Sequence, residues 1–377
     1  MSIRNINCGA NIRRIVKSLC FINKCFGLLS YNTLENHEKP EEGTLRFETS
    51  YWQLFFAGMV QIAVLVLTIV FYETYFGSLV AVSIMEGIFH FLYVTSQIML
   101  LILTITASKI HNADILRLFD KLVSLADEII TLNPKSEKEY WNIKVMLWIY
   151  TAVLLSIIGL NAFAVWPVLT SNAEKRLTLL TALTLAVYSF IFQTLTIMTF
   201  SVVYLLLNYC FDSLNIAIEG VVTEGLSESD AVSRLNRTLP IYQNIFQCSR
   251  RFNQIYSPQI LVQFSLLLTV SVLMLYQMAS YLPEDVKERS KLIIYSLALL
   301  AFYGYLCSVY VFVAEIFVEQ VVAKLKNTLF KLINKAKDEK LRIEVNALAL
   351  QILHEDHEIT AAGFFVVDLR IVTTVSA

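Results

Sequence analysis

Six long stretches of the chain contain no Asp, Glu, Lys or Arg residue. They cover residues 49–72, 87–108, 145–173, 177–211, 252–283 and 292–314. A helix crosses the hydrocarbon core of a bilayer with about 20 consecutive apolar residues, so each stretch is long enough to span it. Lipid offers no hydrogen-bond partner to peptide groups, so a span has to pair its own backbone as a helix or form part of a closed barrel. The stretches lack the short alternating pattern of membrane β-strands, so we expect α-helices. The sequence therefore predicts an all-α, polytopic membrane protein with spans at about 50–72, 80–108, 145–167, 177–207, 257–280 and 292–313.

The composition of the chain argues against other classes of protein. Hydrophobic residues make up 56% and charged residues 16% of the sequence, which is far more apolar than a soluble helical protein. The net charge is −1 and no basic stripe lies outside the loops, so we expect no nucleic-acid partner. The sequence has no phosphate-binding glycine loop, Cys-x-x-Cys or His-Glu-x-x-His motif, so we predict neither an enzyme nor a cofactor. His354 and His357 are interpreted as part of a solvated helix face rather than as metal ligands.

The positive charges are distributed unevenly among the segments between the spans. Of the 30 Lys and Arg residues, 24 fall in the N-terminal segment and in segments 108–144, 208–256 and 314–361, whereas the short loops between them hold five. Loops rich in Lys and Arg remain on the cytoplasmic side of a membrane. We therefore predict that residues 1–48 form a cytoplasmic N-terminal segment. This topology is the reverse of that of G-protein-coupled receptors.

The predicted cytoplasmic segments carry apolar residues at helical spacing. Residues 11–31 form an amphipathic pattern, which we interpret as a helix on the membrane surface. Residues 109–132 and 314–336 repeat apolar residues every three or four positions, and a further stripe runs from Leu341 to Ile352. Such stripes need an apolar partner, so we predict a cytoplasmic helical bundle, with residues 314–361 forming anchor helices and some contact between subunits.

The sequence from Ala361 to Asp368, Ala-Ala-Gly-Phe-Phe-Val-Val-Asp, resembles the insect gustatory receptor family. In this family a small-small-Gly-Phe-Phe turn, two apolar residues and Asp mark the start of the seventh span. The motif residues in this chain are Gly363, Phe364, Phe365 and Asp368. We accordingly interpret residues 362–377 as the start of a seventh, pore-type helix in a seven-span chemoreceptor architecture.

The chain differs from the family at its end. The family closes its seventh span with Thr-Tyr, five variable residues and Gln-Phe, whereas here Thr373 and Thr374 are followed by valine. Ile371 to Ala377 is a run of seven residues, which rises roughly 10 Å as a helix and cannot cross a bilayer core about 30 Å thick. We therefore expect the seventh span to be truncated.

The resemblance implies a function in taste. The family's subunits assemble as homo- or hetero-tetramers with other gustatory receptor subunits in the plasma membrane of sensory neurons. A small-molecule tastant opens a non-selective cation channel lined by the seventh helices, and each subunit binds its ligand in the outer half of its own bundle. We expect the same properties in this chain. Its expected partners are thus a small-molecule tastant, other receptor subunits and the lipid bilayer.

Polar and aromatic residues in the outer halves of the spans are the candidate ligand contacts. Glu86, His90 and Tyr93 lie at spacings of four and three, which places them on one face of span two. Ionisable residues within a span are costly to bury and often serve function. The alternative is that Glu86 and His90 pair with each other or with a neighbouring helix. The remaining candidates are Asn161, Trp166, Tyr188, Tyr276, Gln277 and Tyr295.

Three alternatives to a gustatory receptor remain open. The first is an odorant receptor of the same superfamily, and the second is a truncated subunit that conducts no ions. The third is a secondary transporter. Such proteins have inverted repeats with spans interrupted at corresponding positions, whereas this sequence shows one such interruption, Ser257-Pro258, and no counterpart in its first half.

Overall fold

The structure is a computed structural model. It describes residues 5–25, 28–34, 46–59, 84–132, 176–223, 228–280, 286–318, 324–335, 339–355 and 358–368, and single positions 62, 63, 66, 149, 152, 156, 159 and 370. Within these ranges the chain is almost entirely helical. Two small hairpins supply the described strands.

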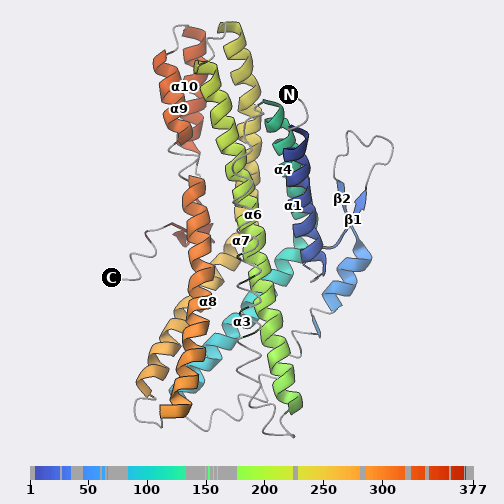
Figure 1. The fold of residues 1–377 in the computed structure, drawn as a ribbon, viewed down its shortest axis with the longest axis vertical. Helices are drawn as coiled ribbons and strands as arrows, with labels where there is room; N and C mark the ends of the chain where they lie inside the picture. Colours follow the sequence, from blue (N-terminus) through green and yellow to red (C-terminus); the bar gives the residue numbers. More distant parts are fainter. Residues whose placement is uncertain are drawn as a thin grey trace.

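Four long helices form the body of the molecule (Figure 1). They are α3 (Ile84–Ile110), α6 (Arg176–Thr223), α7 (Glu228–Ser280) and α8 (Val286–Val318). Helix α7 runs antiparallel to α6 and α8 and contacts α3, α6 and α8. These helices are long because their sequences hold few helix-breaking residues, and α7 continues through Pro240 and Pro258.

Three of the described helices are long and apolar enough to cross a membrane. They are Phe190–Gly220, Asp230–Val272 and Leu300–Val318, each of which contains a sufficiently apolar stretch. A fourth span arises if Ile98–Ile110 and Asn112–Ile129, bent by 68°, count as one. The predicted spans 80–108, 177–207, 257–280 and 292–313 fall on α3, α6, α7 and α8. Of the predicted span 50–72 the structure describes residues 50–59, 62, 63 and 66, and most of 145–167 lies outside the described residues. Helices α6 and α7 extend well beyond their predicted spans.

The extensions join shorter helices at one end of the bundle, drawn uppermost in Figure 1. These are α1 (Asn5–Cys25), α4 (Asn112–Leu132), α9 (Lys326–Lys335) and α10 (Glu339–His354). The apolar stripe predicted for 109–132 is confirmed by burial of Ile115, Phe119, Leu122, Leu125 and Ile129. The stripe from Leu341 to Ile352 is likewise buried, where α10 packs on α9 and α7.

The N-terminal helix corrects the prediction of a helix lying on the membrane surface. Helix α1 ends at Cys25, and Tyr31 already belongs to β1 (Tyr31–Leu34), which pairs antiparallel with β2 (Arg46–Thr49). Ile12, Ile15 and Leu19 of the apolar stripe are buried because α1 packs along α4, whereas Phe21, outside the stripe, is exposed. The stripe was identified correctly, but its partner is protein rather than lipid.

Aromatic side chains fill the contact between α6, α7 and α8. The rings of Phe200 and Tyr310 lie 4.8 Å apart, and Tyr204 lies 5.1 Å from Phe317 and 5.9 Å from Phe252, in edge-to-face arrangements. Such geometry matches the ring quadrupoles and adds to the burial of large apolar surfaces.

A short hairpin follows α10 and corrects the predicted start of the last helix at residue 362. Strand β3 (Thr360–Ala361) pairs antiparallel with β4 (Phe365–Val366). The turn between them places Ala362 at φ 52° and Gly363 at φ 76°, a left-handed conformation that favours glycine and ends helical structure. The ring of Phe365 packs 5.4 Å from that of Phe264 on α7. Residues 371–377 lie outside the described part of the chain.

Candidate functional site

The predicted ligand residues fall largely outside the described side chains. Glu86, His90 and Tyr93 lie on the first turns of α3, Tyr188 on α6, Tyr276 and Gln277 on the last turns of α7 and Tyr295 on α8. Helices α3, α6 and α8 begin, and α7 ends, toward the lower end of the bundle in Figure 1. The backbone therefore brings these positions to one end of the bundle. Of these side chains only that of Tyr276 is described, and it is partly buried, while Asn161 and Trp166 lie outside the described residues.

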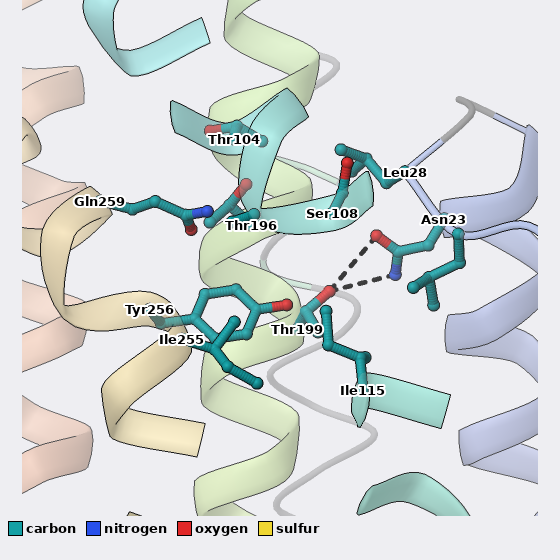
Figure 2. A pocket seen from close by; sticks show the side chains of 12 residues that line it. Asn23, Leu28, Thr104, Ser108, Ile115, Thr196, Thr199, Ile255, Tyr256 and Gln259 are labelled. Atoms are coloured by element: carbon teal, nitrogen blue, oxygen red, sulfur yellow. Dashed lines mark hydrogen bonds between the residues drawn. The ribbon is translucent and has the colours of Figure 1, made fainter. Parts of the chain in front are cut away.

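The described side chains form a different site, a buried polar pocket in the interior of the bundle (Figure 2). Residues from five helices and from the segment after α1 surround it, and its water-accessible volume is about 20 Å³. The lining residues are Asn23, Leu28, Leu29, Thr104, Ala107, Ser108, Ile115, Thr196, Thr199, Ile255, Tyr256 and Gln259.

Asn23, in the last turn of α1, forms one side of the pocket. Its Nδ2 donates to Thr199 Oγ1 on α6 at 3.0 Å and to the carbonyl of Leu19 at 2.9 Å. Its own carbonyl accepts from the peptide nitrogen of Leu28 at 2.8 Å. Asn23 is buried, so these bonds are shielded from water. The side chain therefore ties the N-terminal segment directly to α6.

A second asparagine holds the same segment at the bend between α3 and α4. The side chain of Asn112, at the start of α4, accepts from the Ser30 peptide nitrogen and donates to the Ser30 carbonyl, both at 3.0 Å. Asn112 is 1% exposed. This arrangement resembles the pairing of two strand residues and satisfies both peptide groups of Ser30. The bend of 68° is thus linked to the N-terminal segment.

Ionisable groups beside the pocket are held neutral. Burial raises the pKa of the Cys20 thiol above its usual value, and burial together with the neighbouring Cys20 and Cys25 raises the pKa of the Tyr31 hydroxyl. The pocket lining itself contains no carboxylate, histidine or basic side chain. Among the described residues, no three His, Cys, Asp or Glu side chains gather as metal ligands. The pocket is therefore suited to binding a small neutral polar molecule.

Polar contacts also join the helices at the upper end of the bundle. Tyr242 on α7 donates to Glu355 Oε2 at 2.5 Å, and Gln351 Nε2 donates to Glu355 Oε1 at 2.9 Å. Thr328 on α9 donates to Glu219 on α6 at 3.2 Å. A wider cavity of about 390 Å³ lies between α7, the end of α10 and β3, with His354 and Glu355 among its lining residues.

Sequence analysis did not single out Asn23, Asn112 or Gln259. The only sequence signal at Asn23 is its position four residues after Leu19, which places a polar residue on the apolar face of α1. Gln259 follows Ser257-Pro258 within an apolar stretch. A polar residue in such a position indicates a buried hydrogen bond, but the sequence does not identify the partner.

Comparisons with known proteins identify a family and solved structures that the chain resembles. The model of a family described as 7tm chemosensory receptor matches residues 16–377. The chain is similar to the insect olfactory receptor OR5 from Machilis hrabei in complex with eugenol, with a TM-score of 0.72 and 13% identity over 98% of this chain and 96% of that chain. It is also similar to the structure described as OR5 alone, with a TM-score of 0.68, 15% identity and the same coverage. No curated protein sequence matches the chain significantly. The predicted fold class, an all-α membrane protein of seven-span insect chemoreceptor architecture, is confirmed.

Proposed function

Since the chain belongs to the 7tm chemosensory receptor family, we propose that it is a gustatory receptor. In this proposal it is a subunit of a tastant-gated, non-selective cation channel in the plasma membrane of sensory neurons. The observation that carries the proposal is the family match over residues 16–377, together with the gustatory-type motif from Gly363 to Asp368. The family consists of receptors rather than enzymes.

Assembly into tetramers is supported by an unpaired apolar face on the anchor helices. Ile343, Leu350 and Leu353 on α10 are 61%, 55% and 46% exposed. Their spacings of seven and three residues place them on one face of the helix. Outside the membrane, such a face is stabilised by covering it with another protein surface. A neighbouring subunit would supply that cover, in a homo- or hetero-tetramer.

The orientation proposed here places the N-terminus in the cytoplasm. The supporting observation is the concentration of Lys and Arg in the segments that extend the spans at the upper end of the bundle. Helices α4, α9 and α10 contain several of these residues. The ligand would then enter from the opposite, extracellular end, where α3, α6 and α8 begin.

We propose that the ligand contacts lie at that extracellular end, around Glu86, His90 and Tyr93. The supporting observation is that the backbone brings these positions to the same end of the bundle as Tyr188, Tyr276, Gln277 and Tyr295. A small ligand needs a concave, mostly apolar site with a few polar groups. Asn161 and Trp166 remain candidates from sequence alone.

An odorant receptor is the second candidate function. It is favoured by a specific observation, because two solved structures that share the fold are of an insect olfactory receptor. The two candidates differ in the ligand rather than in the fold, and so they are separated by the compounds that evoke a response.

Expression of the chain in cells without endogenous chemoreceptors tests the proposal. Calcium imaging and whole-cell recording would compare soluble tastants with volatile odorants, in cells where surface labelling shows the receptor at the plasma membrane. We expect cation currents evoked by tastants. Responses to volatile compounds alone would establish the second candidate. No current in response to either tastants or odorants, with the chain expressed alone or together with gustatory subunits, would contradict the channel assignment and support a non-conducting subunit.

A further inference from the structure

A buried glutamine lines the pocket without a hydrogen-bond partner for its carbonyl oxygen. Gln259 on α7 is 2% exposed, and its Oε1 has no partner among the described residues. Figure 2 shows its amide extending toward Thr196 on α6, with the nitrogen on the side of Thr196 and the oxygen turned to the side. A buried amide oxygen without a partner costs free energy, and within a membrane-spanning helix no lipid group can serve. A polar molecule in the pocket would remove this cost.

Three hydroxyl groups around the pocket already donate their protons within their own helices, so they present acceptor lone pairs to it. Ser108 donates its proton to the carbonyl of Ile105 at 2.8 Å, Thr196 to that of Phe192 at 2.9 Å and Thr199 to that of Leu195 at 2.8 Å. Each hydroxyl oxygen therefore retains lone pairs, and the oxygen of Gln259 adds another acceptor. The molecule that completes this site has to donate hydrogen bonds.

Charge and size restrict the class of donor. No acidic side chain lines the pocket, and a buried cation without a counter-charge is strongly disfavoured. A volume of about 20 Å³ exceeds the 10–15 Å³ that one water needs. Organic donors need far more room. A water molecule has two protons to donate and is stable where it has two to four polar partners.

We propose that this pocket is a binding site for one ordered water molecule. The water donates hydrogen bonds to Gln259 Oε1 and to hydroxyl oxygens on the facing helices, with Thr196 the principal partner. It thereby connects α7 to α6 in the interior of the bundle, beside the point where Asn23 connects the N-terminal segment to α6. The proposal depends on the described side chains alone and not on the receptor's ligand or ion selectivity.

A double-mutant cycle tests the proposal by thermal unfolding of the full chain in detergent. Gln259→Met keeps the shape of the side chain and removes its acceptor, and Thr196→Val removes the hydroxyl. Thr194→Val is the matched control, since Thr194 is also buried and donates to the carbonyl of Phe190 at 2.8 Å but does not line the pocket.

We expect Gln259→Met to lower the Tm by about 1–3 °C, because the water loses its partner. Thr196→Val should lower the Tm more than Thr194→Val does. The double variant Gln259→Met/Thr196→Val should unfold at nearly the temperature of the less stable single variant, because the same water is lost only once. Additive shifts, equal shifts for the two threonines, or a Tm that Gln259→Met leaves unchanged or raises would overturn the proposal, since removing an unsatisfied amide from a dry pocket does not destabilise the fold.

A second measurement does not depend on variants that fold. A cryo-electron microscopy map of the unmodified receptor in lipid nanodiscs, at a resolution that shows ordered water, should contain a density peak within hydrogen-bond distance of Gln259 Oε1 and Thr196 Oγ1. An empty pocket in such a map, with waters visible elsewhere in the bundle, would overturn the proposal.

Discussion

The end of the bundle that holds α1, α4, α9 and α10 is built differently from the end where α3 and α8 begin. At the first end, amphipathic helices bury one face each, and ion pairs join their other faces, such as Arg13 with Asp127 at 2.6 Å. At the second end, beyond the charged first residues of α6 and α8, the sequence is apolar on nearly every side of each helix. An amphipathic stripe shows which face meets a neighbour. A uniformly apolar helix shows only that it is surrounded by apolar groups.

The difference separates two kinds of function within one chain. The amphipathic end has the paired charges and packed stripes that fix helices relative to one another. The apolar end has few polar groups, and these are the candidates for recognising a ligand. We expect substitutions at the first end to affect folding and assembly, and substitutions at the second to affect ligand response.

A buried charge in the anchor should produce the largest effect. Val345 on α10 is 0% exposed, so Val345→Asp places an unpaired carboxylate among apolar side chains and costs on the order of 5 kcal/mol or more. We expect the receptor to accumulate poorly and to elute as aggregate in size-exclusion chromatography. Leu350→Asp, on the exposed face of the same helix, is the matched control. It should fold and, if that face joins subunits, elute as a smaller species. Equal behaviour of the two variants would contradict the distinction between the faces.

Loss of a core aromatic side chain should have a smaller but still large effect in the middle of the bundle. Phe317→Ala removes a ring that packs against Tyr204 and Phe211 and should cost about 3–5 kcal/mol of stability. Phe312→Ala, at an exposed position of the same helix, should change the melting temperature little. Fluorescence-detected thermal unfolding of both variants measures the difference. A similar loss at both positions would indicate that Phe312 is covered in the assembled receptor.

Removal of the Asn112 side chain should release the N-terminal segment. Asn112→Ala leaves the Ser30 peptide nitrogen without its partner and removes one of two bonds to the Ser30 carbonyl, which also accepts from the Ser50 peptide nitrogen at 3.2 Å, and it should cost about 1–3 kcal/mol. We expect faster hydrogen exchange at the Ser30 amide and faster proteolysis near it. Asn112→Asp keeps the acceptor for the Ser30 amide but places a buried carboxylate beside the Ser30 carbonyl, so it should destabilise the chain at least as much as Asn112→Ala. Exchange in Asn112→Ala as slow as in the unmodified chain would show that other contacts hold the segment.

A substitution at the apolar end should change ligand response without changing stability. Glu86→Gln removes a charge and should raise the half-maximal ligand concentration by about tenfold, equivalent to about 1.4 kcal/mol, if Glu86 contacts the ligand. Calcium dose–response curves and thermal unfolding of the same preparation separate the two effects. A loss of stability with an unchanged response would assign Glu86 to helix pairing instead.

The smallest effect is expected at an exposed ion pair of the amphipathic end. Arg251 on α7 lies 2.7 Å from Asp114 on α4, and the two side chains are 50% and 32% exposed. Solvent screens such pairs, so Arg251→Ala should cost less than about 1 kcal/mol. Thermal unfolding at low and high salt should show a difference from the unmodified chain that shrinks as salt rises. A loss that persists in high salt would show that the arginine contributes packing rather than charge.

The same contrast explains how far the sequence predicts the structure. The stripe from Ile115 to Ile129 predicts its buried face correctly because amphipathic spacing is a local property. The stripe of α1 was assigned to lipid, since the sequence cannot distinguish an apolar protein surface from a membrane. The turn at Ala362 and Gly363 was predicted from its motif, but the range 362–377 assigned to the last helix includes this turn and strand β4.

The candidate sites show the same limit. Glu86, His90 and Tyr93 can be selected from sequence because ionisable residues are conspicuous in an apolar span. Asn23 and Gln259 are ordinary polar residues whose importance depends on partners far away in the chain. Asn23 and Thr199, for example, are 176 positions apart. Only the folded arrangement reveals such a pairing.

Asn112 contacts the main chain of Ser30, which has a consequence for how the two positions tolerate change over evolutionary time. A peptide group is the same whatever residue carries it, so a small side chain at position 30 can be exchanged for another without disturbing the two bonds. Position 112 has no such freedom, because few side chains offer a donor and an acceptor in that geometry. Preserving this contact therefore constrains the residue type at position 112 more than the residue type at position 30.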